Sequence, residues 1–189
     1  MSIRSASRDD LTSVGVPHRR IVCAEHWTVD RMNSPNINRP LFDEPREYPG
    51  FSCLRARIGR QLGSQKLGVS LFEVPPGEAA YPYHFHLAEE EVIVVLAGRP
   101  SLRTPEGWRK LEEGAVMSFL VGEGGAHQLV NRTDEPIRFL AFSNQQPDIV
   151  IRPDSGTLSV AERRPDDGGV HYHFRAEDAV GYIEGERAP

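Results

Sequence analysis

From Leu54 to Val160 the chain is a series of short apolar runs separated by turn residues, and this pattern constrains its fold more than any other feature. Leu67–Val74 ends at a Pro-Pro-Gly turn, and Glu91–Ala97 ends at Gly98. Such runs are typical of the strands of an all-β sandwich or barrel. We therefore expect a series of short strands here and no helix. The other expected strands are Leu54–Arg60, Ala80–His86, Ser101–Thr104, Trp108–Leu111, Ala115–Val121, His127–Val130, Ile137–Ser143 and Ile149–Ile151.

Composition supports a turn-rich β protein and excludes several functional classes. The 189 residues include 17 Gly and 15 Pro, a combined share above the usual value of about 12%. The formal net charge is −5, so the chain has no basic excess with which to neutralise nucleic-acid phosphates. We expect a small-molecule ligand or substrate and no nucleic-acid partner.

Cysteine usage and hydropathy define the expected environment. The only two cysteines, Cys23 and Cys53, exclude a disulfide framework and a four-cysteine zinc site. No apolar run reaches the ~18 residues of a membrane span, and the first residues lack the apolar stretch of a secretion signal. We expect a cytoplasmic protein that does not contact membranes.

The chain divides into three parts. Residues 1–50 are rich in proline, for example at Pro17 and Pro35, and proline removes backbone donors, so we expect an irregular N-terminal arm. This arm is either a partly ordered leader or a segment that packs on the domain or on a partner subunit. Residues 51–160 form the β domain, and residues 161–189 form a polar linker and a small terminal element.

The run Glu91–Ala97 (EVIVVLA) is apolar on both faces. Alternate strand residues face opposite sides, so Ile93 and Val95 share the face of Glu91, and Val92, Val94 and Leu96 face the other side. A single small barrel would leave its outer face in water. Burial of both faces therefore predicts self-association, and we expect a homodimer.

Four residues carry the chemistry. His84 and His86 stand two apart in an expected strand, so both imidazoles project from one face. A short turn then returns the chain to Glu91, which opens the next strand and shares a face with core residues. His127 begins a later strand after the glycine-rich turn at 122–125. Three imidazoles and a carboxylate that converge in this way predict a metal site.

These histidines could also be core residues or a chance occurrence of the pattern. A lone buried histidine is more often a hydrogen-bonded core residue than a ligand, and an H-x-H pattern arises readily by chance. A second copy, His171-Tyr172-His173, has Glu177 four residues later. It has no histidine downstream and no apolar strand after the glutamate. We therefore interpret the second copy as a chance match to the pattern and not as a metal site.

The sequence resembles the cupin superfamily over about residues 54–150. The first cupin motif appears as Gly77-EAAYPY-His84-Phe85-His86-LAEE-Glu91-VIVVLA-Gly98, and the second as Gly114-AVMSFLVGEGGA-His127-QLV-Asn131. The resemblance implies a double-stranded β-helix, or jelly-roll barrel, of two antiparallel sheets. It also implies that His84, His86, Glu91 and His127 are the metal ligands.

The chain departs from the family pattern in both motifs. Six residues, not five, separate Gly77 from His84, and Leu120 stands where proline is usual, before a turn two residues longer. These changes affect the rim of the site and leave the metal ligands in place. Glu90 is the rival of Glu91 as a ligand. We prefer Glu91 because it shares a face with Ile93. We expect Glu90 either to be exposed in the turn or to orient a ligand from behind, and Asn131 to support the ligands.

The ligand set suits Fe, Mn, Zn, Ni, Co or Cu and does not choose among them. Four protein ligands leave open positions for substrate, water or dioxygen. We expect a metal-dependent enzyme for a small polar metabolite, with oxidative chemistry of the dioxygenase type preferred over decarboxylase, isomerase or aminohydrolase activity. The alternatives are a non-catalytic module that binds a sugar-like ligand or metal, and a structural barrel with vestigial ligands. Three aromatic residues are candidates to line the pocket, with packing in the core or at an interface as the alternative: Tyr81, Phe119 and Phe139.

Overall fold

The computed structural model describes residues 34–162 and 169–187, and Cys23 and Pro17 lie outside these ranges. The described residues form thirteen strands, one short α-helix and two 3-10 turns. The elements up to β5 are β1 (Arg46–Tyr48), β2 (Phe51–Ala56), α1 (Ile58–Gln61), β3 (Gly68–Val74), β4 (Phe85–His86) and β5 (Glu91–Ala97). Those that follow are β6 (Ser101–Thr104), β7 (Gly107–Lys110), β8 (Val116–Phe119), η1 (Glu123–Gly125), β9 (Gln128–Val130), β10 (Ile137–Ser143), β11 (Asp148–Arg152), β12 (Thr157–Ala161), β13 (His171–Arg175) and η2 (Ala176–Asp178).

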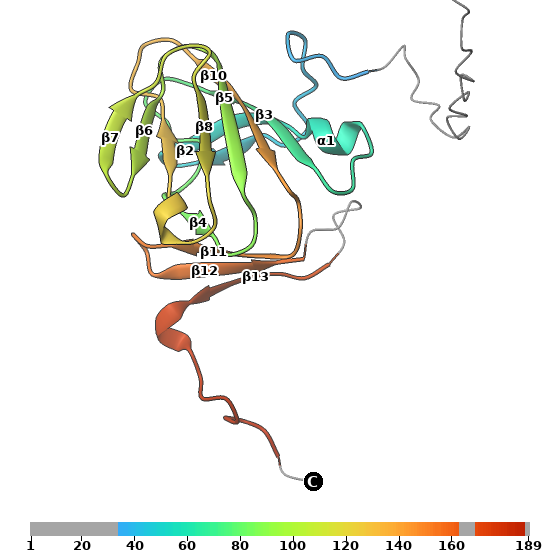
Figure 1. Cartoon of the computed structure of the whole chain (residues 1–189), viewed down its shortest axis with the longest axis vertical. Helices are drawn as coiled ribbons and strands as arrows, with labels where there is room; N and C mark the ends of the chain where they lie inside the picture. The colour runs from blue at the N-terminus through green and yellow to red at the C-terminus, as the bar shows by residue number, and fades with distance from the viewer. Residues whose placement is uncertain (1–33, 163–168, 188–189) are drawn as a thin grey trace, which may run out of the picture.

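The strands form antiparallel sheets in a jelly-roll arrangement (Figure 1). One sheet has the strand order β1-β2-β3-β10-β5-β8. The others have the orders β13-β12-β11-β4 and β7-β6-β9. Isolated bridges pair Ala79 with Val130 and His84 with His127, and the second of these connects the chain beside β4 to the chain beside β9. The two smaller sheets are therefore joined at the position of two of the candidate ligands.

The main core lies between the large sheet and the β6–β9 pair. Ile93 and Val95 are fully buried on the inner face of β5, as their alternation with Val92 and Val94 predicts. On β10, Phe139 stacks against Phe72 of β3 with ring centroids 4.9 Å apart. Packing of this density fixes the strands that carry the candidate site.

Most expected strands form within a residue or two of their predicted bounds, but three expectations were wrong. The strand expected at Leu54–Arg60 instead spans Phe51–Ala56. Residues 54–160 do contain a helix, α1, which follows β2 and packs Ile58 against Ala56 and Leu71. The expected strand Ala80–His86 shrinks to Phe85–His86. Its earlier part is held by separate backbone contacts, such as the bond from Ala80 N–H to the Leu129 carbonyl at 3.0 Å.

Part of the apolar outer face that suggested self-association is covered within the chain. A second cluster joins Leu96 of β5 and Leu140 of β10 to the fully buried Leu71 of β3 and to Ile58 of α1. Phe42, from the segment before β1, packs on the same cluster. The double-sided pattern of Glu91–Ala97 thus has an intramolecular explanation at Leu96.

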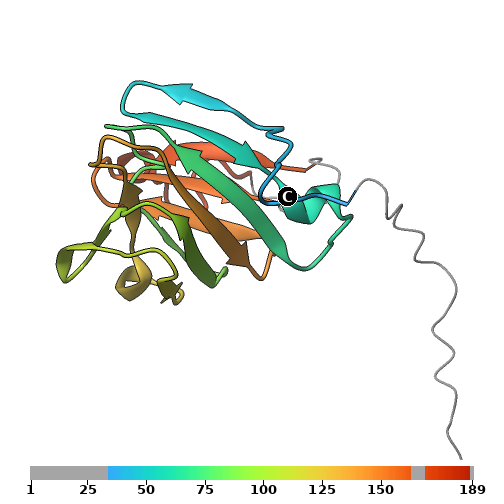
Figure 2. The same ribbon diagram turned by 90° about the horizontal axis from the view of Figure 1, so that it is seen from above.

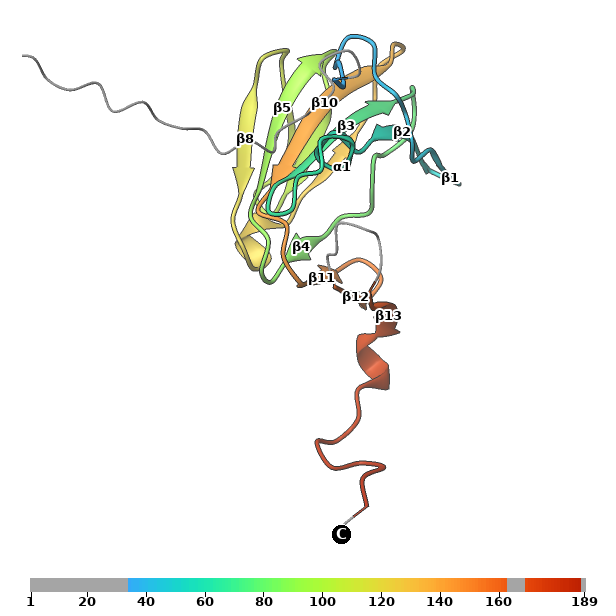
Figure 3. The ribbon, with the colours of Figure 1, turned by 90° about the vertical axis from the view of Figure 1, so that its right-hand side faces the viewer.

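Both ends of the described chain add strands to the sheets. β1 pairs with β2 at the edge of the large sheet (Figure 2). β13 pairs with β12, and the chain after it runs away from the sheets with its side chains exposed (Figure 3). No helix among the described residues is long and apolar enough to cross a membrane.

Candidate metal centre

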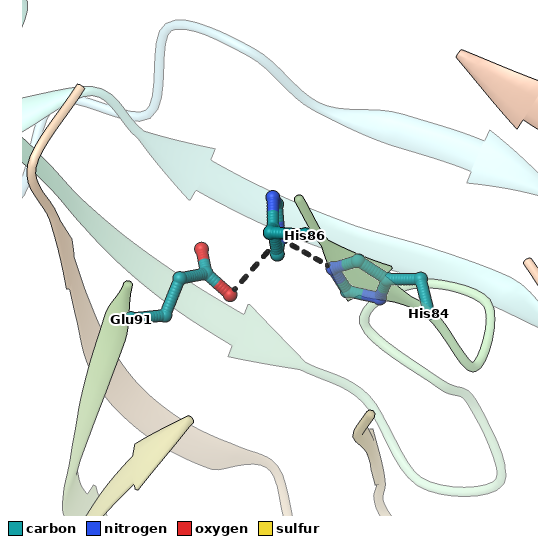
Figure 4. Close-up of side chains that lie close together, drawn as sticks. All are labelled: His84, His86 and Glu91. Atoms are coloured by element: carbon teal, nitrogen blue, oxygen red, sulfur yellow. Dashed lines mark hydrogen bonds and ion pairs between the residues drawn. The ribbon is translucent and has the colours of Figure 1, made fainter. Parts of the chain in front are cut away.

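The four predicted ligands come together at the inner end of the space between the sheets. His84 Nε2 lies 3.1 Å from His86 Nε2, and His86 Nε2 lies 3.4 Å from Glu91 Oε2 (Figure 4). His127 Nε2 lies 3.0 Å from the same carboxylate oxygen. His84, His86 and His127 are buried, with His127 fully so. The ligand atoms of His84, His86 and Glu91 therefore lie within 4.8 Å of one another, and His127 joins this group through its contact with Glu91.

Each imidazole is oriented by a hydrogen bond from its other nitrogen. His84 Nδ1 lies 2.8 Å from the Pro82 carbonyl, and His127 Nδ1 lies 3.0 Å from the Gly125 carbonyl. His86 Nδ1 lies 2.5 Å from Asp148 Oδ2. A carbonyl or carboxylate oxygen can only accept, so each Nδ1 carries the proton. In the neutral rings every Nε2 then presents a lone pair to the centre, as metal-binding histidines do.

The backbone holds the three histidine-bearing segments together. The Gly122 N–H donates to the His86 carbonyl at 2.7 Å, which ties the long turn of the second motif to β4. The His127 ring stacks on Phe119 of β8, with centroids 3.8 Å apart. The longer turn, expected only to alter the rim, therefore contacts the strand that carries His86.

The titration behaviour of the cluster follows from burial and mutual charge. Burial and the neighbouring His127 lower the pKa of His84 to about 3. Burial also acts to lower the pKa of His86, but the Asp148 and Glu91 carboxylates outweigh it and raise that pKa to about 9. Burial would raise the pKa of Glu91, yet its contacts with His127 and His86 hold it well below its usual range. Glu91 is therefore a carboxylate anion.

The donor set fits a divalent transition-metal ion. His127 Nε2 is buried and has no hydrogen-bond partner among the described residues, because its approach to Glu91 lacks hydrogen-bond geometry. Ligand atoms about 2.1 Å from one ion lie about 3 Å apart, which matches the contacts within the cluster. With a pKa of about 9, His86 can donate a proton from Nε2 to His84 Nε2 at 3.1 Å, and a bound cation would take the place of that proton between the two nitrogens. His84, His86 and Glu91 thus have the atom types and spacing of a possible metal site, with the buried His127 Nε2 beside the same carboxylate.

Two acidic residues at the site were not predicted from the sequence. Asp148 begins β11, and besides His86 it accepts a hydrogen bond from the Ala88 N–H at 2.8 Å. Glu89 is 3% exposed and lies within 4.8 Å of His86 and Asp148 by its ligand atoms. The only signals in the sequence were an aspartate bordering an apolar run and one more glutamate in a row of three. Neither pattern distinguishes an inward carboxylate from a surface one.

Neither Glu90 nor Asn131 contacts a candidate ligand through its side chain in the described structure, and the exposed Glu90 matches one of its two expected positions. The Glu90 side chain is exposed, while Glu89 and Glu91 on either side of it point inward. Asn131 is fully buried, but its amide donates to the Val74 and Glu135 carbonyls at 2.9 and 2.8 Å. Asn131 thus stabilises the turn before β10, and Asp148 has the position expected of a supporting residue.

The expected aromatic residues occupy three different positions. Tyr81 lines the cavity and contacts the His84 and His127 rings edge-on. Its hydroxyl is buried without a hydrogen-bond partner among the described residues, and burial followed by the Glu91 charge raises its pKa well above 10. Phe119 supports His127 from behind, and Phe139 belongs to the core.

A cavity of about 520 Å³ runs outward from the candidate metal ligands, between the large sheet and the β11–β12 pair. His84, His86, Glu89, Glu91 and Tyr81 line its inner part. The remaining wall is basic, with Glu44 and Glu162 as its acidic members. The arginines that line the cavity are Arg46, Arg55, Arg57, Arg60 and Arg152. An acidic chain therefore presents a cationic wall to whatever enters this space.

The second H-x-H pattern lies on the edge strand β13. His171 and His173 are exposed, and their ring centroids are 4.8 Å apart. His173 Nδ1 is hydrogen-bonded to Ser159 Oγ at 2.7 Å. Neither residue belongs to a group of three convergent ligands among the described residues.

Comparisons with known proteins agree with this architecture. A solved protein from Acidithiobacillus ferrooxidans, provisionally named a sugar phosphate isomerase, shares 23% identity over 70% of this chain and 82% of its own, with a TM-score of 0.62. A sugar phosphate isomerase of a cupin superfamily from Silicibacter pomeroyi shares 26% identity over 72% of this chain and 83% of its own, with a TM-score of 0.61. No curated protein matches the sequence. Residues 70–143 match the family model of the cupin domain. Residues 70–143 of the chain are thus a cupin domain.

Proposed function

We propose that this chain is a metal-dependent cupin enzyme that isomerises a small phosphorylated sugar. The observation that carries the metal assignment is the shared orientation of three imidazoles. His84, His86 and His127 each donate from Nδ1 to a fixed oxygen and turn Nε2 towards Glu91. Nothing in an ordinary core requires three such nitrogens at one point.

The substrate class rests on the cavity and on one comparison. The cavity joins the four-residue cluster to an arginine-rich wall, which suits a ligand with hydroxyl groups at one end and an anion at the other. The Silicibacter pomeroyi protein that shares this fold at 26% identity is named a sugar phosphate isomerase. Together these observations favour a phosphorylated sugar over an apolar substrate.

The residues divide the chemical work between them. His84, His86, His127 and Glu91 would hold the metal ion. A bound divalent ion would act as a Lewis acid that polarises a carbonyl or hydroxyl oxygen and acidifies the adjacent C–H. The Tyr81 hydroxyl, buried at the inner end of the cavity, donates a hydrogen bond to a substrate oxygen. The walls of both sheets exclude bulk water from this end.

The oxidative alternative uses the same ligands. Iron or manganese held by three histidines and a carboxylate supports dioxygen chemistry as well. A binding module without turnover would use the same metal and cavity. The experiment must therefore measure metal content, isomerisation and oxygen uptake on one preparation.

Protein purified without an affinity tag is first assayed for metals by mass spectrometry. We expect close to one equivalent per chain, most of it lost in His127→Ala and retained in His173→Ala, the matched imidazole on β13. Less than about a tenth of an equivalent, with no uptake on reconstitution, would overturn the metal assignment.

Turnover is then followed by solvent deuterium incorporation into a panel of aldose and ketose phosphates, with an oxygen electrode in parallel. Metal-dependent exchange without oxygen uptake supports the isomerase. Oxygen uptake would replace it with the oxidative alternative, and metal-dependent ligand binding without any turnover would replace it with the binding module.

A further inference from the structure

Arg152 is the last residue of β11, and the pleat of that strand turns it towards the cavity. Asp148, Val150 and Arg152 alternate along one face of the strand. Asp148 bonds to His86, and both Val150 and Arg152 line the cavity. Ile151 faces the opposite side, where it packs against the cluster of Tyr83, Phe85 and Ala126. The strand that supports His86 therefore also carries an arginine on the same face.

The register of β4 and β11 places Arg152 close to the candidate metal ligands. β4 and β11 pair His86 with Val150 and Phe85 with Ile151. The same antiparallel register, continued by one residue, sets His84 and Arg152 at one level on neighbouring chains. Neighbouring strands lie about 4.8 Å apart, so the long Arg152 side chain reaches the space beside His84.

Arg152 differs from other arginines of the cavity in its partners. Arg46, Arg55 and Arg57 contact Glu44 at 2.7, 3.1 and 3.2 Å. Among the described residues, none gives the Arg152 guanidinium an ion pair or a hydrogen bond. Partial burial lowers its pKa, and no carboxylate of the described residues offsets that effect. A half-buried cation with no counter-ion in the described part of the chain is costly, and an anionic ligand would remove that cost.

We propose that Arg152 is the oxyanion-binding residue of this cavity, holding the phosphate or carboxylate group of a ligand whose other oxygens face His84, His86, Glu91 and His127. The guanidinium fork matches either oxyanion in a bidentate geometry. This inference deepens the proposed function, since it names the residue that would select a phosphorylated substrate over its neutral counterpart. Arg152 is a binding residue and takes no part in proton transfer.

The test measures anion binding to the metal-loaded full-length chain by isothermal titration calorimetry. The two probes are inorganic phosphate and malonate, which separate a phosphate-specific subsite from a carboxylate one. Arg152→Gln should weaken binding of the preferred anion by about 10- to 100-fold, the usual effect of losing a charged hydrogen-bonding partner. Arg152→Lys should restore part of the affinity, because charge returns without the planar fork.

Arg99→Gln is the matched control, since Arg99 pairs with Glu112 on the exposed surface away from the cavity. It should bind both anions as the unmodified chain does. Equal binding by Arg152→Gln and the unmodified chain would overturn the subsite, as would binding of both anions weaker than about 10 mM by the unmodified chain.

Metal content separates this proposal from the one before it. If Arg152→Gln keeps its metal and loses anion affinity, the oxyanion subsite and the metal assignment both stand. If the chain holds no metal but binds anions through Arg152, the oxyanion subsite stands and the metal-dependent function falls. If the chain holds its metal but Arg152→Gln binds anions as tightly as the unmodified chain, the metal assignment stands and the oxyanion subsite falls.

Discussion

His84 and His127 are direct backbone partners: the His127 N–H donates to the His84 carbonyl at 2.9 Å, and the His84 N–H donates to the His127 carbonyl at 3.2 Å. An antiparallel pair that exchanges both bonds holds its side chains on one face at a fixed separation. The two imidazoles are therefore positioned by main-chain geometry, with ring centroids 4.7 Å apart. Two residues 43 positions apart in sequence become one rigid unit of the site.

Asp148 orients the third imidazole, so Asp148→Asn should lower metal affinity without unfolding the protein. The amide is nearly isosteric, but it no longer supplies the charge that holds the His86 Nδ1 proton. Loss of such a support costs about 10- to 100-fold in metal affinity. Competition with a metal-buffering chelator measures the change. Asp154→Asn, at the partly exposed pair with Arg103, is the control and should match the unmodified chain; an unchanged affinity in Asp148→Asn would refute the orienting role.

Substitution of the adjacent glutamates tests which of them is the ligand. Glu91→Gln should lose most of the bound metal, because an anionic oxygen 3.0 Å from His127 Nε2 is replaced by a neutral amide. Glu90→Gln changes an exposed side chain and should retain full occupancy. Elemental analysis of the two variants side by side decides the matter, and the reverse ranking would place the ligand at Glu90.

The Tyr81→Phe substitution should lower turnover without lowering stability. The Tyr81 hydroxyl is buried without a partner among the described residues, and such a group costs about 1–3 kcal/mol. Its removal should leave the thermal midpoint unchanged or raise it, while turnover falls. Tyr83→Phe, in the separate cluster with Phe85, should leave turnover intact. A destabilised Tyr81→Phe variant with normal turnover would show that Tyr81 has only a packing role.

Two neighbouring glycines provide a matched pair for the turn that precedes His127. A Cβ at Gly125 would lie 1.8 Å from the Leu120 carbonyl oxygen, whereas a Cβ at Gly124 meets nothing within 4 Å. Gly125→Ala must displace the turn whose carbonyl orients His127, and we expect a loss of about 1–3 kcal/mol in unfolding free energy together with weaker metal binding. Gly124→Ala should be close to neutral. Chemical denaturation and metal titration of both variants check this expectation.

Glu44 should make stability dependent on pH in the acid range. Burial raises the pKa of its carboxyl, but the guanidiniums of Arg55, Arg46 and Arg57 outweigh burial and hold it below its ordinary value of 4.5. A lowered folded-state pKa stabilises the protein above 4.5 and ceases to do so as the pH falls through the lowered value. Glu44→Gln should therefore cost about 1 kcal/mol at pH 7 and progressively less below pH 4.5.

Urea unfolding of Glu44→Gln across pH 3–7 tests that dependence. Glu112→Gln removes a carboxylate whose pair with Arg99 is exposed, and it should have little effect at any pH. A cost for Glu44→Gln that stays constant down to pH 3 would contradict the assignment of the effect to ionised Glu44.

Much of the fold could be predicted because strands leave a local signature. The run Glu91–Ala97 forms a strand with the predicted bounds, and Ile93 and Val95 are buried on the predicted face. The α1 helix was missed because four residues are too few for a helical period to show. The strand at Ala80–His86 was too long because its aromatic residues pack through isolated contacts and not along one ladder.

The candidate site, like the fold, could be predicted from the sequence only in part. Residue types, their spacing and the two motifs were enough to nominate His84, His86, Glu91 and His127, because ligand chemistry restricts which side chains can serve. Asp148 and Arg152 could not be found in this way. Each is an ordinary charged residue at an end of a strand, and its role depends on the pairing of β11 with β4. Alternation along a strand is a local property that the sequence determines by itself, whereas the choice of neighbouring strand, and hence which charges face a cavity, is a long-range property that only the tertiary structure decides.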